Sequence, residues 1–342
     1  MKQASYYTVV SGKLKKVRCD LCPHHCLLPE GRTGICLARK NVDGILRSLV
    51  YCRPVSTAID PVEKKPLYHF FPGSYIFSSG PNGCTFKCLF CQNCEISQSF
   101  FPAKEISPAV FFESIINSGT IGIAYTYSEP FVWFETVMDV GAMVREHGLK
   151  NVMVTNGFME QKPLSDLLTL VDAMNIDIKS MNPAFYRKMC KAKLAPVLAA
   201  CETVKKKCHL EITNLLIPGE NDSVQDIRQL VDFVSANLGK NTPVHFSRYF
   251  PRYKLAVAPT PHSSLALAYE IAREKLEYVY IGNDNSGSGN NTVCPSCGEV
   301  LVRRNGYTVS VNQRLGPNPV TGTAICPSCS HQTNIRIAEA GR

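Results

Sequence analysis

The sequence has no long apolar run. No stretch of its 342 residues approaches the roughly 18 consecutive apolar residues that a membrane span needs. Residues 1–10 also lack the apolar core of a secretory signal. We therefore expect neither a membrane-spanning nor a secreted protein, but a soluble, cytoplasmic chain.

Positive charge is in excess, but no basic patch stands out. The formal net charge is +9, yet lysines and arginines are scattered and the one short run, residues 205–207, falls on an expected helix face. A solvated helix face accounts for this run better than a nucleic-acid site does. The charge therefore predicts no nucleic-acid partner, although a basic surface attracts an anionic substrate or an acidic protein.

Cysteine is abundant, with 16 residues. Because a reducing cytosol keeps thiols free, this number in a chain without a signal peptide indicates metal sites rather than disulfides. The cysteines form a front, a central and a tail cluster. Five others lie outside the clusters: Cys52, Cys94, Cys190, Cys201 and Cys208.

The central cluster consists of Cys84, Cys88 and Cys91, on a loop that follows an apolar, strand-like run at residues 75–77. Three thiolates at this spacing can bind three irons of a 4Fe-4S cluster, whereas full ligation needs a fourth cysteine. The spacing predicts a cluster with one open iron. A three-cysteine zinc site, or buried cysteines without metal, are the alternatives.

The tail cluster contains two Cys-Pro-Ser-Cys knuckles with strand-like segments between them. Such knuckles form a tetrahedral site, so we predict a structural zinc, with a rubredoxin-like iron as the alternative. Its ligands are Cys294, Cys297, Cys326 and Cys329.

The front cluster consists of Cys19, Cys22, Cys26 and Cys36. Four ligands this close suit either zinc or an auxiliary iron-sulfur cluster, and the spacing does not decide between them. A small segment rich in glycine and proline gains its fold from a closed structural metal, which slightly favours zinc.

Between the clusters, short apolar strands alternate with helical stretches. Ser107 and Pro108 are typical of a helix start, and residues 131–147 have a helical pattern. The alternation predicts an α/β fold with a parallel sheet. The expected strands are residues 75–77, 122–125, 151–154, 173–178, 209–213, 244–246 and 278–281.

Polar side chains recur where the expected strands end. One such residue alone is typical of a turn or a helix cap. Since functional residues gather at the carboxyl ends of parallel strands, the series predicts one site at this rim. The series comprises Thr126, Glu129, Thr155, Asn156, Asp177, Lys179, Thr213, Asn214, His245, Ser247 and Arg248.

Glycines and asparagines at residues 283–291 have the composition of a flexible linker. We therefore expect a metal-binding segment at residues 1–52, a core at 53–282, the linker at 283–291 and a zinc ribbon at 292–342.

Together these residues resemble the radical S-adenosylmethionine (radical SAM) superfamily, in particular the pyruvate formate-lyase activating enzyme group and, within it, the radical enzymes of the AmmeMemoRadiSam system. The resemblance is carried by the loop at residues 84–93, by the front and tail clusters, and by residues 60–66 and 211–219. It implies a partial (β/α)6 barrel of the TIM type, a 4Fe-4S cluster, S-adenosylmethionine and a low-potential electron donor.

The resemblance also implies a role for each site residue. The open iron chelates the amino and carboxylate groups of S-adenosylmethionine. A cationic sulfonium with a zwitterionic tail needs one carboxylate and one cation, which Glu129 and Lys179 provide. The implied contacts are Phe90 near the adenine, Glu129 at the ammonium, Thr155 and Asn156 near the ribose, Asp177 and Lys179 at the charged end, and His245 in the same pocket.

The implied activity is reductive cleavage of S-adenosylmethionine to a 5′-deoxyadenosyl radical, which removes hydrogen from a partner protein or a metabolite. Two departures argue against a literal pyruvate formate-lyase activase. Val154 stands where those activases carry an acidic residue, and Cys94 stands where an aromatic residue is expected.

Two other functions compete with this one. A zinc-dependent binding module places zinc in all three clusters, and a radical SAM enzyme that modifies RNA needs a basic aromatic surface, for which the tail offers Arg303, Arg304 and Tyr307. We further expect a large substrate, because metal-stiffened modules at both ends of the core can frame its mouth. Structural support alone is the alternative role of these modules.

Overall fold

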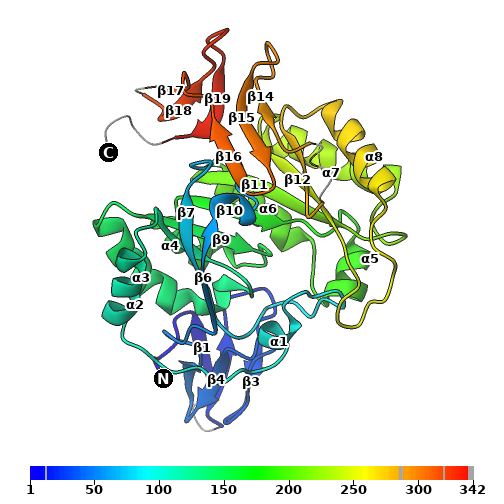
Figure 1. The fold of residues 1–342 in the computed structure, drawn as a ribbon. Helices are drawn as coiled ribbons and strands as arrows, with labels where there is room; N and C mark the ends of the chain where they lie inside the picture. Colours follow the sequence, from blue (N-terminus) through cyan, green and yellow to red (C-terminus); the bar gives the residue numbers. More distant parts are fainter. Residues whose placement is uncertain (12–13, 285–286, 288, 319, 338–342) are drawn as a thin grey trace.

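The computed structural model describes residues 1–11, 14–284, 287, 289–318 and 320–337. A front module, a central α/β core and a tail ribbon follow one another along the chain (Figure 1). Among the described residues, no helix is long and apolar enough to cross a membrane.

The core is one eight-stranded sheet in the order β13-β12-β11-β10-β9-β8-β7-β6. Strands β7 to β13 are parallel, and β6 pairs with β7 in the antiparallel sense. The predicted parallel α/β fold is confirmed, with one parallel strand more than a six-stranded barrel has. The strands are β6 Ser56–Pro61, β7 Tyr75–Gly80, β8 Gly122–Tyr125, β9 Lys150–Thr155, β10 Ala173–Asp177, β11 His209–Leu216, β12 Val244–Arg248 and β13 Val279–Gly282.

Helices connect the parallel strands. The predicted start of α2 is confirmed, because Ser107 caps it by accepting a hydrogen bond from the Val110 amide at 3.2 Å. The predicted helix at residues 131–147 consists of a 3-10 turn, η2, followed by α3. The helices are η1 Val62–Lys64, α1 Cys94–Ser97, α2 Pro108–Asn117, η2 Pro130–Trp133, α3 Phe134–Glu146, α4 Gln161–Leu167, α5 Pro183–Phe185, η3 Tyr186–Cys190, α6 Ala195–Lys205, α7 Val224–Phe233, η4 Val234–Leu238 and α8 His262–Arg273.

The two faces of the sheet pack against different partners. On β8, Ile123 and Tyr125 belong to the core that the helices complete, whereas Ala124 belongs to a second cluster. That second cluster includes Val62 and Phe70. Successive side chains of a strand point to opposite faces. Residues 62–71, called the inner segment below, therefore fill the face that the helices leave open.

The front module lies beside η2 and α3. Trp133 Nε1 donates to the Val50 carbonyl at 2.7 Å, and the Ser5 amide donates to Glu135 Oε1 at 2.8 Å. These contacts hold the module at the rim where the strands end. Its strands are β1 Tyr7–Ser11, β2 Lys16–Cys19, β3 Leu27–Leu28, β4 Arg39–Val42 and β5 Ile45–Ser48.

The tail ribbon lies at the opposite end of the core, at the top of Figure 1. The Phe71 amide donates to the Arg336 carbonyl at 2.8 Å, and Asn334 Nδ2 donates to the carbonyl of Asn241, just before β12. The ribbon thus meets the amino ends of the strands. Its strands are β14 Thr292–Val293, β15 Val300–Asn305, β16 Thr308–Val311, β17 Gly316–Pro317, β18 Thr323–Ile325 and β19 Gln332–Arg336.

The structure differs from two expectations about the tail, namely its position at the mouth of the core and the flexible linker that precedes it. The ribbon does not frame a mouth at the carboxyl ends of the strands, because it packs at their amino ends. The expected linker at 283–291 includes packed residues, since Gly289 accepts a hydrogen bond from the Ile281 amide and Asn290 is buried. Residues 285, 286 and 288 of this segment lie outside the described residues.

Candidate functional site

A cavity of about 400 Å³ opens at the carboxyl ends of the parallel strands. This volume lies in the usual range for small-molecule sites. Thiols from the loop after β7 and polar side chains from the next five strand ends meet there. The predicted residues that line it are Cys84, Cys88, Phe90, Cys91, Thr126, Glu129, Thr155, Asn156, Asp177, Lys179, Thr213 and Ser247, whereas Asn214, His245 and Arg248 are not part of the lining.

The cysteine loop follows β7 and is pinned on both sides. The Lys87 and Leu89 amides donate to carbonyls of the η3 turn at 2.9 and 3.0 Å. On the other side, Gly83 has a φ of +95°, and a Cβ there lies only 2.3 Å from the Cys36 carbonyl oxygen. Only glycine fits this approach. The loop is therefore packed directly against the front module.

The thiols carry hydrogen bonds that suit metal-bound thiolates. Cys84 Sγ accepts from the Phe86 amide at 3.3 Å and from Asn156 Nδ2 at 3.6 Å, and Cys91 Sγ lies 3.1 Å from Ser97 Oγ. Such bonds tune the potential of iron-sulfur clusters. Among the described residues that line the cavity, no fourth cysteine joins the three. This donor set fits a 4Fe-4S cluster with one open iron.

Glu129 is the buried carboxylate of the cavity. Its Oε1 accepts from Thr155 Oγ1 at 2.6 Å and from the Phe131 amide at 3.0 Å, and its Oε2 accepts from the Asn156 amide at 2.9 Å. Burial raises the pKa of Glu129 to about 7, against the effect of these three donors. A cation placed beside it therefore gains a fixed partner.

Lys179 and Asp177 lie on the other side of the cavity as an ion pair. Lys179 Nζ lies 2.9 Å from Asp177 Oδ2. Burial alone lowers the pKa of Lys179, but the Asp177 carboxylate raises it above its usual value. Lys179, which the sequence predicted as the cation of the site, is thus already in an ion pair. A ligand in the cavity therefore meets the Lys179–Asp177 ion pair rather than an unpaired ammonium group.

Sequence reasoning assigned no role to a second polar group in the cavity. Lys64 and Lys65 line it beside Tyr127. Lys65 Nζ lies 2.7 Å from Asp60 Oδ2 and 4.8 Å from the centre of the Tyr127 ring, and the Tyr127 hydroxyl donates to the same carboxylate. Two adjacent lysines shortly before Pro66 were the signal for this cationic side.

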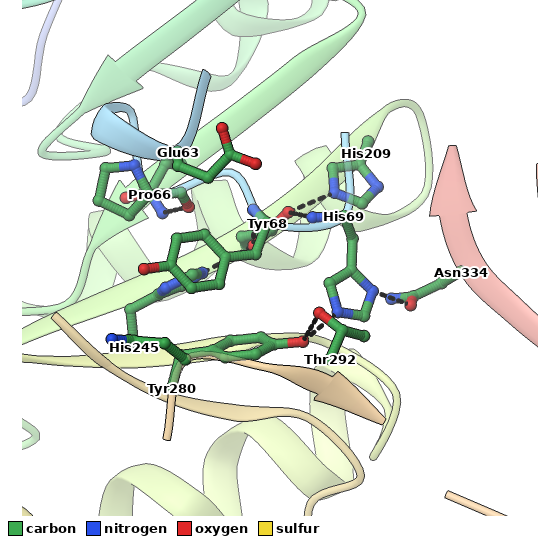
Figure 2. Close-up of polar contacts among 12 residues, drawn as sticks. Glu63, Pro66, Tyr68, His69, His209, His245, Tyr280, Thr292 and Asn334 are labelled. Atoms are coloured by element: carbon green, nitrogen blue, oxygen red, sulfur yellow. Dashed lines mark hydrogen bonds and ion pairs between the residues drawn. The ribbon is translucent and has the colours of Figure 1, made fainter. Parts of the chain in front are cut away.

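His245 is not part of the cavity lining and lies beside Tyr280 and Tyr68 instead (Figure 2). His245 Nε2 lies 2.7 Å from Glu211 Oε2, and its ring stacks on Tyr280. Ser247, two residues further along β12, lines the cavity instead. The alternation of side chains along a strand predicts which face of the sheet a residue lies on, but not how far below the cavity it lies.

Glu211 is the centre of this group of side chains. It accepts hydrogen bonds from His209, His245 and the Tyr68 and His69 amides. Burial alone raises its pKa, but His209 and His245 hold the pKa of Glu211 well below its usual range. The carboxylate thereby fixes the inner segment beneath the cavity.

The tail ribbon reaches the same group of side chains. Arg304 has a buried side chain that donates to the Tyr68 carbonyl at 2.7 Å and stacks 4.1 Å from the Tyr68 ring centre. Its Nε lies 3.5 Å from Glu63 Oε1. His69 Nδ1 lies 2.5 Å from Asn334 Oδ1 (Figure 2). The buried side chain of Arg304 therefore stabilises the fold. It is not part of the exposed basic surface that an RNA-modifying enzyme would need.

The tail cysteines form a compact group. Their sulfur atoms all lie within 4.8 Å of one another, with Cys294 Sγ 3.6 Å from Cys329 Sγ and Cys297 Sγ 3.7 Å from Cys326 Sγ. A tetrahedral site with metal–sulfur bonds of about 2.3 Å places its sulfurs about 3.8 Å apart. The group therefore fits a single metal ion.

The front cysteines surround a small cavity of their own. Cys19, Cys22, Cys26 and Cys36 line it together with His24, Gly34, Arg39 and Thr85, among other residues. The predicted set of four is thus brought together. Thr85 belongs to the central cysteine loop, so the front and central groups are neighbours.

Comparisons with known proteins agree with the site. The model of the radical SAM superfamily matches residues 79–234. An uncharacterized protein of Methanocaldococcus jannaschii is 46% identical over 310 residues, which cover 89% of this chain and 92% of that protein. A pyruvate formate-lyase-activating enzyme of Listeria monocytogenes is 22% identical over 166 residues, covering 44% of this chain and 66% of the enzyme.

A likeness among solved structures concerns the fold. A radical SAM methyltransferase from Sphaerobacter thermophilus superposes with a TM-score of 0.51 at 16% identity, covering 68% of this chain and 71% of that one. Residues 79–234, which match the superfamily model, contain the cysteine loop and most of the strand ends that line the cavity. The chain belongs to the radical SAM superfamily, resembles the pyruvate formate-lyase activating enzymes within it, and is a radical SAM enzyme.

Proposed function

We propose that this enzyme cleaves S-adenosylmethionine reductively at a 4Fe-4S cluster held by Cys84, Cys88 and Cys91, and abstracts hydrogen from a partner protein or a metabolite. One observation carries the proposal. Three thiols, a buried carboxylate and a lysine–aspartate pair line a single cavity at the carboxyl ends of the strands. These are the groups that a zwitterionic sulfonium ligand and an open iron need.

When bound, the cluster and S-adenosylmethionine supply the one-electron chemistry that yields a 5′-deoxyadenosyl radical. The residues of the chain bind and orient. Glu129 partners the ammonium group, the Asp177–Lys179 pair lies at the charged end, and Phe90 covers the adenine. Thr155 holds Glu129 in place through the hydrogen bond at 2.6 Å.

Lys64 and Lys65 add a cationic wall to the proposed substrate side. Asp60 neutralises part of this charge, since both lysine Nζ atoms lie within 2.8 Å of its carboxylate oxygens. Val154 lines the cavity where pyruvate formate-lyase activases have an acidic residue. We therefore favour a substrate that differs from theirs, in line with the resemblance to the AmmeMemoRadiSam radical enzymes.

The tail ribbon, in this proposal, holds one zinc through Cys294, Cys297, Cys326 and Cys329 and stabilises the core. Its buried Arg304 and its contact with the inner segment support a structural role. The front module alone lies at the rim, so it is the module available to help recruit a large substrate.

The experiment that tests the proposed function measures 5′-deoxyadenosine after anaerobic incubation of the reconstituted chain with reductant and S-adenosylmethionine. We expect release from the unchanged chain and none from Cys88→Ala. Cys94→Ala is the matched control, because Cys94 begins α1 on the same loop and should keep the activity. Release from Cys88→Ala equal to that of the control contradicts the proposal.

The same sample separates the proposal from a zinc-dependent binding module. An iron-sulfur protein is brown and absorbs broadly in the visible range. A colourless chain with zinc in all three cysteine groups favours the binding module. A brown chain that releases deoxyadenosine excludes it.

A further inference from the structure

The front cysteines differ from the tail cysteines in how their sulfurs are arranged. In the tail group the sulfurs touch, and all lie within 4.8 Å of one another. In the front group the four thiols line the wall of a cavity. Within the described part of the chain, no other set of three or more His, Cys, Asp or Glu side chains has its ligand atoms this close together.

This arrangement distinguishes two kinds of metal centre. Around a single ion, four thiolates lie about 3.8 Å apart. In a 4Fe-4S cluster each thiolate binds a different iron, so the sulfurs stand further apart around a central volume. The central cysteines line a cavity of about 400 Å³, and the front cysteines line a much smaller one of about 10 Å³. Neither the front nor the central sulfurs form a group as compact as that of the single-ion site in the tail.

A buried cation faces the front cavity. Arg39 lines it, is 1% exposed, and has an Nε atom that lacks a hydrogen-bond partner in the described structure. Its other guanidinium nitrogens bond to the Ser5 carbonyl and to Glu135. A buried donor without a partner is costly. An anionic metal–thiolate centre in the cavity supplies the missing acceptor, whereas Glu135 already balances the charge of the guanidinium.

The front cavity adjoins the central cysteine loop. Thr85, next to Cys84, lines the front cavity, and its carbonyl lies 2.7 Å from His24 Nε2. Gly83 packs against the Cys36 carbonyl so closely that a side chain there has no room. Backbone of the two cysteine groups is thus in direct contact, with no intervening domain.

From this geometry we propose that Cys19, Cys22, Cys26 and Cys36 hold a second, auxiliary iron-sulfur cluster that delivers electrons to the central site. Held by these four cysteines, such a cluster would accept one electron from a reduced protein donor of the ferredoxin or flavodoxin class, which would be oxidised. It would return to its oxidised form on passing that electron to the centre on the Cys84 loop. A zinc ion cannot perform this step, because it has no accessible redox change.

The test uses the full chain with Cys84, Cys88 and Cys91 all changed to alanine, reconstituted anaerobically with iron and sulfide. We expect about four iron atoms per chain, as one 4Fe-4S cluster requires, and a paramagnetic resonance signal after reduction. A further Cys22→Ala change should abolish both the iron and the signal. A further Cys208→Ala change, at a cysteine outside the clusters, should preserve them.

A triple variant that holds no iron and about two zinc ions per chain overturns the proposal. If the triple variant does not fold, the single Cys22→Ala change decides. It should lower iron from about eight to about four atoms per chain, since one of two clusters is lost. Unchanged iron with the loss of one zinc contradicts the auxiliary cluster. If the unchanged chain holds both clusters, is reduced by a chemical reductant and still releases no deoxyadenosine, the proposed function of the central site fails while the metal assignment of the front group stands.

Discussion

The front module and the tail ribbon lie at opposite ends of the core and are built in a similar way. Each carries four cysteines and is tied down by one buried arginine–glutamate pair. In the front module Arg39 pairs with Glu135 at the start of α3, at 2.5 Å. In the tail ribbon Arg304 pairs with Glu63 of the inner segment, at 3.5 Å.

The surroundings of the two pairs differ. Arg39 lies among front thiols at the rim, next to the loop that carries Cys84. Arg304 lies against Tyr68, below the cavity, where it fixes the inner segment. The comparison teaches that similar cysteine modules serve different purposes here. In our proposal, the front module serves the chemistry and the tail ribbon serves the fold.

The strongest way to break this comparison is to remove the tail anchor. Arg304→Ala leaves Glu63 and the Tyr68 carbonyl buried without their partner. Removing one member of a buried ion pair costs about 3–5 kcal/mol of unfolding free energy. Chemical denaturation of the zinc-loaded chain measures the loss.

Arg303→Ala is the matched control, since Arg303 is the exposed neighbour on the same strand. Exposed substitutions of this kind change stability by less than about 0.5 kcal/mol. Equal effects of the two variants show that Arg304 does not anchor the ribbon.

A change at the rim should weaken ligand binding rather than the fold. Glu129→Gln removes the charge that we assign to the ammonium group of S-adenosylmethionine. A hydrogen bond to a charged group is worth about 1.5–3 kcal/mol, so the dissociation constant should rise roughly ten- to a hundredfold. Equilibrium binding to the reconstituted chain measures it.

Iron content must stay constant for this result to count. Glu113→Gln, on the exposed side of α2, is the control and should bind S-adenosylmethionine normally. Loss of iron together with binding in Glu129→Gln points to misfolding, and unchanged binding removes Glu129 from the site.

A smaller effect on stability is expected from pH at His69, where the inner segment contacts Asn334 of the tail ribbon. Burial lowers the pKa of His69 to about 3. The unfolded chain, with a histidine pKa of about 6.5, binds a proton that the folded chain does not. Stability therefore falls as the pH drops from about 6.5 towards 3. Between pH 7 and pH 5 this group alone costs about 2 kcal/mol.

His69→Gln sharpens this point, because glutamine does not titrate. The variant should be less stable than the unchanged chain at pH 7 but should lose about 1–2 kcal/mol less on moving to pH 5. Urea unfolding at the two pH values measures the difference. Parallel losses in both proteins exclude His69 as the source.

Sequence reasoning predicted the parallel strands well because each is a short segment in which apolar residues predominate. Strand β8 was expected at the residues where it lies, Gly122–Tyr125. The cysteine loop and Glu129 followed from local spacing and from position after a strand. Such features depend on neighbours in the chain, so a sequence pattern carries them.

Depth and long-range pairing could not be predicted in the same way. His245 and Ser247 share a face of β12, yet only Ser247 lines the cavity. The contact of Arg304 with Glu63 joins residues 241 positions apart. Two parts of the chain create it, and neither part alone contains a signal for it. The packing of the inner segment against the sheet was not predicted, for the same reason.

The metal content of the full chain, purified anaerobically and reconstituted, tests the central claim most directly. If the front module serves the chemistry and the tail ribbon serves the fold, each chain holds about eight iron atoms in two clusters and about one zinc. About four iron atoms and two zinc ions per chain contradict this account, because both modules then carry a structural ion.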